Sequence, residues 1–163
     1  MVCLTLSPSR YNSANILLPP QASESRLYTI SPSTRESLRK FRLSTSRAKD
    51  PQAMIYHIDS KTMEILPVDS TVYTTLQDIA DELPDNSPRY VLLSYPLTMK
   101  SSGRMSVPYV MLNFMPPTCS SQARMLYAGA KELMKNSAEV GRILEVESGE
   151  EVEGVEERLQ GEE

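Results

Sequence analysis

The sequence predicts an α+β protein in which helices cover both faces of a central mixed β-sheet. Two segments of strand length, 89–95 and 105–114, are almost continuously apolar, as is typical of central strands buried on both faces. Helical patterns alternate with hairpin-like segments along the chain, so helices are available for both faces of the sheet. With 163 residues, the chain is long enough for one domain with a real core and too short for two comfortable ones.

The first regular element is a helix whose start is marked by proline and serine. Pro32 suits a position in the first turn, and Ser33 and Glu36 have the spacing of a capping box. The apolar stripe of this helix consists of Leu38 and Phe41, set against basic residues.

A hairpin and a short helix follow. Residues 53–58 have a strand pattern, residues 59–62 form a turn, and residues 63–66 pair back on the first strand. Residues 73–83 are expected to form a helix, which Pro84 ends because proline removes a backbone donor. One face of this helix carries the apolar side chains Leu76, Ile79, Ala80 and Leu83.

The two apolar strands form a second hairpin around a turn at 100–103, and two prolines, Pro116 and Pro117, end the sheet. Ser120 then caps a long helix that continues to about Asn136 and spans ~25 Å. Residues 142–146 read as a last short strand. A glutamate-rich helix is expected over residues 149–160, with Val152, Val155 and Leu159 at helical spacing.

The long helix has two stripes of different character. The expected buried stripe consists of Leu126, Ala130, Leu133 and Ala138, flanked by Tyr127 and Met134. Met125, Gly129 and Glu132 lie on another stripe. A glycine inside a helix costs about 1 kcal/mol relative to alanine, so Gly129 indicates a close approach. Two explanations remain open at this point: the helix packs on its own sheet there, or a partner docks on it.

Charge is distributed unevenly along the chain. Residues 145–163 carry nine glutamates and one arginine, whereas residues 24–144 carry 15 basic and 12 acidic residues. An acidic end on a mildly basic body favours oriented docking on a charged partner, although a solvated acidic helix would look the same. The isoelectric point of 5.2 and the absence of a long basic stripe argue against nucleic acid as a partner.

Few residues are available for catalysis or metal binding. The chain has two cysteines, Cys3 and Cys119, and one histidine, His57. Cys119 and His57 are a conceivable nucleophile pair, but no third orienting group or phosphate-binding glycine loop accompanies them. We therefore expect a binding module without enzymatic activity, cofactor or metal. No apolar run approaches the roughly 20 residues that a membrane span needs.

The first 22 residues differ in composition from the rest. They are rich in serine and proline, and their short apolar run, 16–18, ends at Pro19 and Pro20. That run is too short for the apolar part of a secretory signal. We expect residues 1–22 to be a disordered extension, with a translated artefact ahead of the true start as the alternative, and residues 23–163 to form the domain.

Several separated motifs resemble the glia maturation factor family. They occur in the family's order from about Ser23 to Leu159: Leu38-Arg39-Lys40-Phe41-Arg42, Asp81-Glu82-Leu83-Pro84, Pro88-Arg89-Tyr90, Ser94-Tyr95, Gly103-Arg104, Pro108 and Met125-Leu126-Tyr127-Ala128-Gly129-Ala130-Lys131. The resemblance implies the actin-depolymerising factor homology fold, in which a mixed sheet of five to six strands lies between pairs of helices.

The resemblance also implies a function. Members of the family bind the Arp two-three complex, inhibit its nucleation of new branches and promote dissociation of actin filament branches. The expected partners are therefore this complex and the daughter-filament actin at branch junctions, and the expected location is the cytoplasmic actin cytoskeleton, including cortical patches, with the nucleus as a further location. A monomer is expected, without nucleic acid or membrane partners. The alternative is a cofilin-type protein that binds and depolymerises actin itself.

Two surfaces would carry this function, by resemblance. The first comprises the long helix and the N-terminal segment: Gln122, Arg124, Met125, Ala128, Gly129, Glu132, Ser25 and Arg26. The second faces the filament: Lys100, Arg104, Glu150, Glu151, Glu156 and Arg158. Actin-severing relatives carry a basic residue where this chain has Gln122, which favours the Arp two-three complex over actin. Ser23 and Ser25 are expected phosphorylation sites, because relatives use an N-terminal serine as an off-switch and a phosphate adds roughly −1.5 to −2 charge.

Overall fold

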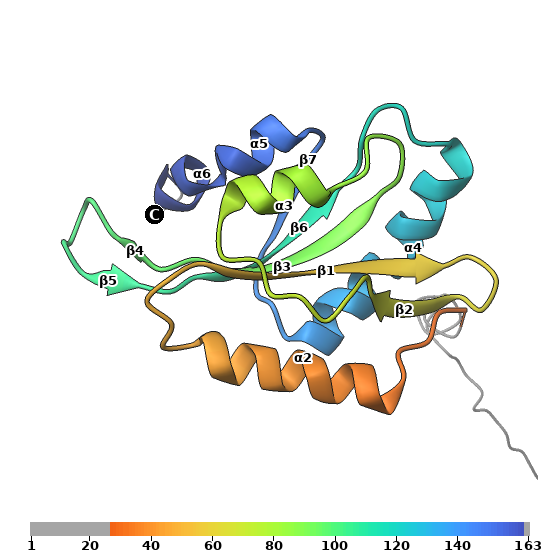
Figure 1. The fold of residues 1–163 in the computed structure, drawn as a ribbon, viewed down its shortest axis with the longest axis horizontal. Helices are drawn as coiled ribbons and strands as arrows, with labels where there is room; N and C mark the ends of the chain where they lie inside the picture. The colour runs from red at the N-terminus through yellow and green to blue at the C-terminus, as the bar shows by residue number, and fades with distance from the viewer. Residues whose placement is uncertain (1–26, 162–163) are drawn as a thin grey trace, which may run out of the picture.

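A five-stranded mixed sheet forms the centre of the computed structural model, which describes residues 27–161 (Figure 1). The strand order is β2-β1-β3-β6-β7; all neighbours are antiparallel except β6 and β7, which run parallel. The strand bounds are Gln52–Asp59 for β1, Glu64–Pro67 for β2, Arg89–Ser94 for β3, Tyr109–Phe114 for β6 and Ile143–Val146 for β7. The expected α+β class and mixed sheet are confirmed.

Helices cover both faces of this sheet, as expected. One face of the sheet is covered by α2, Pro32–Thr45, at the bottom of Figure 1, and by α4, Ser121–Ala138, which starts at the right and passes behind the strands toward α2. Above the sheet lie α3, Leu76–Glu82, and the consecutive short helices α5 and α6, Gly149–Glu153 and Val155–Gly161. A separate two-stranded hairpin, β4 (Leu97–Thr98) and β5 (Met105–Ser106), projects at the left end of the molecule.

Strand β3 shows why the sheet has two cores. Successive side chains of a strand point to opposite faces. Tyr90 and Leu92 therefore enter the cluster below the sheet, which also contains Leu38, Met111 and Met134, all completely or almost completely buried. The intervening side chains of β3 enter the second cluster, above the sheet: Val91 and Leu93. Near-continuous apolarity thus reflects burial on both faces, as predicted.

The starts of two helices differ from the sequence prediction. The N-cap of α2 is Ser31, whose Oγ accepts the Thr34 amide proton at 3.2 Å, so the capping box expected at Ser33 is wrong. Pro32 does occupy the first turn. Helix α3 begins only at Leu76, because Tyr73 is paired with β1 in an isolated bridge.

Two elements expected to be continuous are interrupted. The strand expected over 105–114 breaks between β5 and β6 at Pro108, which has no amide proton for a ladder and whose carbonyl accepts from the Tyr95 amide at 3.1 Å. The helix expected over 149–160 breaks at Gly154, the C-cap residue of α5. Glycine is costly inside a helix, so a break is favoured there. The predicted apolar side chains Val152, Val155 and Leu159 are nevertheless buried.

Candidate functional site

The long helix α4 presents one buried and one free face. Ser120 is its N-cap, as predicted, and accepts the Ala123 amide proton at 3.1 Å. The helix ends at Ala138, two residues beyond the expected end. Its buried side chains are Tyr127, Ala130, Met134 and Ala138, so the expected stripe was wrong about Leu126 and Leu133, which are only half-buried. The buried face is therefore rotated toward the larger side chains Tyr127 and Met134.

The free face of α4 carries the residues expected to bind a partner. Met125 is 75% exposed, and Arg124, Ala128 and Glu132 are exposed as well. Gln122, three residues before Met125 in the same helix, is also exposed. An exposed methionine is unusual for a side chain that normally fills cores, and its flexible thioether adapts well to a binding surface.

A groove runs beside this free face. It has a volume of about 440 Å³ and is lined by Tyr28, Ser60, Met63, Ser120, Gln122, Ala123, Met125 and Leu126. Three segments distant in sequence meet there: the start of the described chain, the turn between β1 and β2, and the first turns of α4. The first segment is held by Thr29, whose amide donates to the Met63 carbonyl and whose carbonyl accepts from Ile65, each at 2.9 Å.

The expected N-terminal contact is therefore adjacent to α4, although Ser23, Ser25 and Arg26 lie outside the described residues. Leu27 begins the described chain and is 61% exposed. Together Leu27, Tyr28, Met125 and Leu126 give this end of the molecule an apolar character. We call this end the α4 surface: Leu27, Tyr28, Gln122, Arg124, Met125, Ala128, Gly129 and Glu132.

Gly129 allows the N-terminal segment to approach the helix. A Cβ atom at this position would lie 2.6 Å from the hydroxyl oxygen of Tyr28, closer than real carbon atoms approach. Tyr28 itself is buried, so its ring has little room to retreat. The explanation that Gly129 packs on the sheet is wrong, because its close neighbour is Tyr28 of the N-terminal segment. Docking of a partner at this position stays a prediction.

We expect Gly129→Ala to have opposite outcomes in two backgrounds. In a Tyr28→Phe protein, which lacks the obstructing hydroxyl, the alanine should stabilise the fold by at most about 0.5–1 kcal/mol through its higher helix propensity, because two ring carbons still lie 3.3 Å from the added Cβ atom. In the parent protein that gain should be absent or reversed. Urea unfolding of the four proteins in this double-mutant cycle measures the difference; an equal gain in both backgrounds would contradict the assigned contact.

The second predicted surface lies at the opposite end of the long axis, around the β4–β5 hairpin and α6 (Figure 1). Lys100 and Arg104 are exposed in the hairpin turn. Glu156 of α6 is tied to the base of this hairpin, because the Tyr95 hydroxyl donates to its carboxylate at 2.8 Å. Glu150 and Glu151 are exposed in α5, and the Glu151 carboxylate also accepts the Glu147 amide proton at 3.1 Å.

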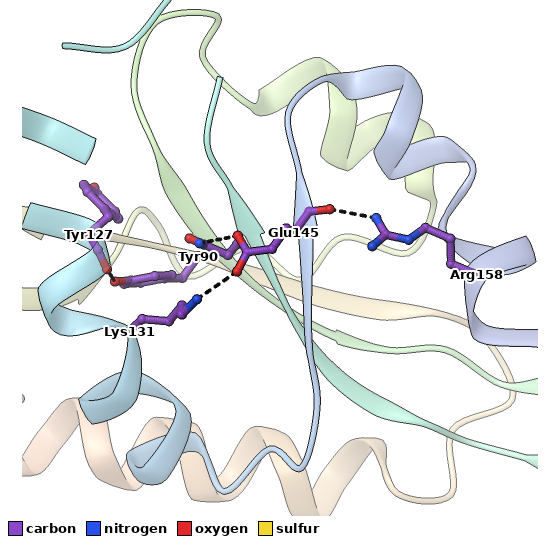
Figure 2. A network of polar contacts seen from close by, with 6 residues as sticks. Tyr90, Tyr127, Lys131, Glu145 and Arg158 are labelled. Atoms are coloured by element: carbon purple, nitrogen blue, oxygen red, sulfur yellow. Dashed lines mark hydrogen bonds and ion pairs between the residues drawn. The ribbon is translucent and has the colours of Figure 1, made fainter. Parts of the chain in front are cut away.

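Arg158 belongs to a contact network at the edge of the sheet (Figure 2). Its guanidinium donates to the Glu145 backbone carbonyl at 2.7 Å. The Glu145 carboxylate in turn accepts from Lys131 of α4 at 2.9 Å and from the Asn113 amide of β6 at 2.6 Å. Strand β7 ends the sheet, and an unpaired edge carbonyl invites pairing with another chain. Arg158 therefore occupies the free carbonyl at this edge. This is a structural role in addition to the binding role expected for it.

Replacing Arg158 by alanine is expected to lower the free energy of unfolding by roughly 1 kcal/mol, because the Glu145 carbonyl loses its charged donor. Arg104→Ala, which removes an exposed cation from the hairpin turn, should leave stability within about 0.5 kcal/mol of the parent. Thermal unfolding of both variants checks the contrast. Equal stability of the two would show that the edge contact contributes nothing.

Two buried tyrosines seat α4 on the sheet. The Tyr90 hydroxyl donates to the Tyr127 backbone carbonyl, the two rings lie 5.1 Å apart, and the Tyr127 hydroxyl accepts the Ile58 amide proton at 3.0 Å. Burial raises the pKa of Tyr90 far above its usual range, so the hydroxyl keeps its proton and remains a donor. The height and rotation of α4 are therefore set by directional contacts as well as by apolar packing.

The conceivable nucleophile pair does not form a site. Cys119 is buried and its thiol lies 3.8 Å from the Met115 sulfur, whereas His57 lies on β1 and is half-buried. Burial lowers the pKa of His57 below its ordinary value, so its neutral form is favoured. Over residues 27–161 no cluster of three histidine, cysteine or acidic side chains is arranged to hold a metal ion. No helix of that part of the chain is long and apolar enough to cross a membrane.

Comparison with known proteins extends over nearly the whole described chain. Residues 27–160 match the family model described as cofilin/tropomyosin-type actin-binding protein. Protein AIM7 of Saccharomyces cerevisiae is 38% identical over 132 residues, which are 77% of this chain and 88% of that protein. Human glia maturation factor beta is 29% identical over 117 residues, covering 72% of this chain and 80% of that protein.

Solved structures agree with these matches. The solution structure of glia maturation factor from Caenorhabditis elegans superposes with a TM-score of 0.63 at 27% identity, covering 76% of this chain and 88% of that one. The crystal structure of Streptomyces griseoflavus cofilin has a TM-score of 0.65 at 14% identity, covering 80% and 96%. At that identity the cofilin likeness concerns the fold alone.

Proposed function

Because the chain belongs to the family of cofilin/tropomyosin-type actin-binding proteins and has glia maturation factors among its relatives, we propose that it binds the Arp two-three complex. On this proposal it inhibits nucleation of new branches and promotes dissociation of existing actin filament branches. Proteins of this family are regulators of actin and not enzymes, and the same holds for this chain. It would act in the cytoplasmic actin cytoskeleton, at cortical patches.

The observation that carries this proposal is the free face of α4. Met125 is 75% exposed beside the exposed Arg124, and it lines a groove to which Tyr28, Met63 and Leu126 also contribute. Binding energy at protein interfaces is concentrated in a few anchors, among which arginine is favoured. An apolar anchor and a cation, adjacent on a rigid helix and next to a groove, form a suitable patch for a protein partner.

The proposed mechanism is mechanical and needs no covalent chemistry. The α4 surface would anchor on an actin-related subunit of the complex, while the β4–β5 hairpin with Lys100 and Arg104 would meet the first actin subunit of the daughter filament. These two regions lie at opposite ends of the long axis (Figure 1), so one molecule can contact both sides of a branch junction. Free energy gained at both contacts would weaken the subunit–filament contact that holds the branch.

Gln122 bears on the choice between the complex and actin. It is exposed at the start of α4, where actin-severing relatives are expected to present a cation, so this chain lacks that charge near Arg124. A glutamine offers hydrogen bonds but no attraction to an acidic groove. We therefore favour the Arp two-three complex over actin itself as the partner.

A binding titration of the full chain tests the proposal, with the purified Arp two-three complex in one arm and filamentous actin in the other. Tighter binding to the complex, together with faster loss of branches in images of branched filaments, is the expected result. Preference for actin would overturn it and make the chain a cofilin-type depolymerising protein. Gln122→Lys serves as a matched variant, which should raise actin binding relative to the parent.

A further inference from the structure

Helix α2 is the most basic element of the described chain. Residues 35–49, which comprise most of α2 and the four residues after it, contain six basic side chains and one acidic side chain. The helix lies below the sheet, whereas the glutamate-rich helices α5 and α6 lie above it (Figure 1). The charge asymmetry of the sequence thus becomes a separation between two faces of the folded molecule, which orients any acidic partner toward α2.

A second groove lies between α2 and the C-terminal half of α4. Its volume is about 440 Å³, and it is lined by Arg35, Arg39, Arg42, Leu43, Asn136, Ser137, Ala138 and Glu139. Asn136 is 11 residues from Met125, which corresponds to roughly 16 Å along the helix axis. This α2–α4 groove is therefore separate from the α4 surface, and both can be occupied together.

The three arginines of the groove differ in the hydrogen bonds and ion pairs that their side chains make within the protein. Arg35 donates through Nε to the Ile30 carbonyl at 3.3 Å, which fixes its stem and leaves its terminal nitrogens available. Arg42 pairs with Glu139 across the groove. The guanidinium of Arg39, between them, has no hydrogen bond or ion pair with any residue from 27 to 161. The groove keeps a net positive charge with donors that match carboxylates in a bidentate manner.

We propose that the α2–α4 groove binds an extended acidic segment of a partner protein. Arg35, Arg39 and Arg42 fall on one face of α2, and the first and last are separated by about 10 Å along the axis. In an extended peptide, side chains on one face recur roughly every 7 Å, so two carboxylates at alternate positions fall within this span. The 65% exposed Leu43 next to the arginines offers an apolar contact for one end of the segment.

A peptide fits this groove better than a lipid surface does. The basic groups line a concavity between two helices instead of a flat face, and a bilayer does not enter such a groove. Asn136 and Ser137 add neutral hydrogen-bonding groups for a peptide backbone. Glu139 lies in the wall and would oppose the dense negative charge of a membrane, whereas a peptide can place its carboxylates around it.

The experiment uses fluorescence anisotropy of a labelled nonapeptide with aspartate at alternate positions, serine between them and leucine at one end. The same peptide with asparagine in place of aspartate is the neutral control. Arg39→Glu is the groove variant, and Lys40→Glu is matched to it. Lys40 belongs to the same helix and undergoes the same charge reversal, but it pairs with Glu36 and lies outside the groove.

We expect the acidic peptide to bind and the asparagine peptide not to bind. Arg39→Glu should weaken binding roughly tenfold, because an attraction becomes a repulsion, and Lys40→Glu by less than about twofold. Equal weakening by both variants would overturn the proposal, since binding would then follow net charge alone. So would binding to vesicles containing phosphatidylserine without binding to the peptide. Unchanged affinity of Arg39→Glu for the Arp two-three complex separates this groove from the α4 surface.

Discussion

Replacing Arg124 and Met125 together by alanine is expected to weaken binding to the Arp two-three complex by roughly 30-fold or more, equivalent to about 2 kcal/mol. Both side chains are exposed, so their loss removes contacts to a partner and none to the core. Arg124 makes no ion pair within residues 27–161 that truncation would break. The stability of the variant should therefore remain within about 0.5 kcal/mol of the parent.

A matched pair of substitutions, one in α2 and one two residues beyond its end, provides the control. Leu43 is 65% exposed and Arg47 is exposed, so the double alanine variant removes an apolar side chain and a cation of similar accessibility. This control should retain the parent's affinity for the complex. Unchanged affinity of the Arg124 and Met125 variant, in a protein that still folds, would refute these two residues as anchors.

Truncation of Leu92 to alanine should lower the free energy of unfolding by about 2–5 kcal/mol. Leu92 has no exposed surface and lies in the central strand β3, where it packs in the cluster between the sheet and the helices α2 and α4. Its neighbours belong to a sheet with strands on both sides and can collapse into the cavity only in part. The melting temperature should fall by roughly 5–15 °C.

Leu43→Ala is the matched control for this loss, because it removes the same atoms from a side chain that is 65% exposed. Its effect on stability should stay within about 0.5 kcal/mol. Urea unfolding measures both variants. A cost below about 1 kcal/mol for Leu92→Ala would mean that the layer beneath α4 is loosely packed, contrary to its complete burial.

Much of this fold follows from local patterns. Continuous apolarity in β3 and β6 indicates central strands, and a serine such as Ser120 before a periodic run indicates a helix start. The exposure of Met125 also followed from its position off the apolar stripe. Some errors had local causes, such as the breaks at Pro108 and Gly154. Others occurred where neighbours in space decide: Tyr73 pairs with β1 instead of starting α3, and the buried stripe of α4 turns toward Tyr127.

The resemblance to the family supplied the two binding surfaces as expectations, but it did not show which of their side chains also make contacts within the protein. In the sequence, Arg158 looks like an ordinary surface cation. In the structure it donates to the Glu145 carbonyl at the edge of β7, because the chain returns there after α5. Gly129 indicates a close approach in sequence, and Tyr28, 101 positions earlier, turns out to make it. The α2–α4 groove likewise joins residues about a hundred positions apart. Periodicity encodes which side chains are buried, whereas such long-range contacts depend on how the elements pack together.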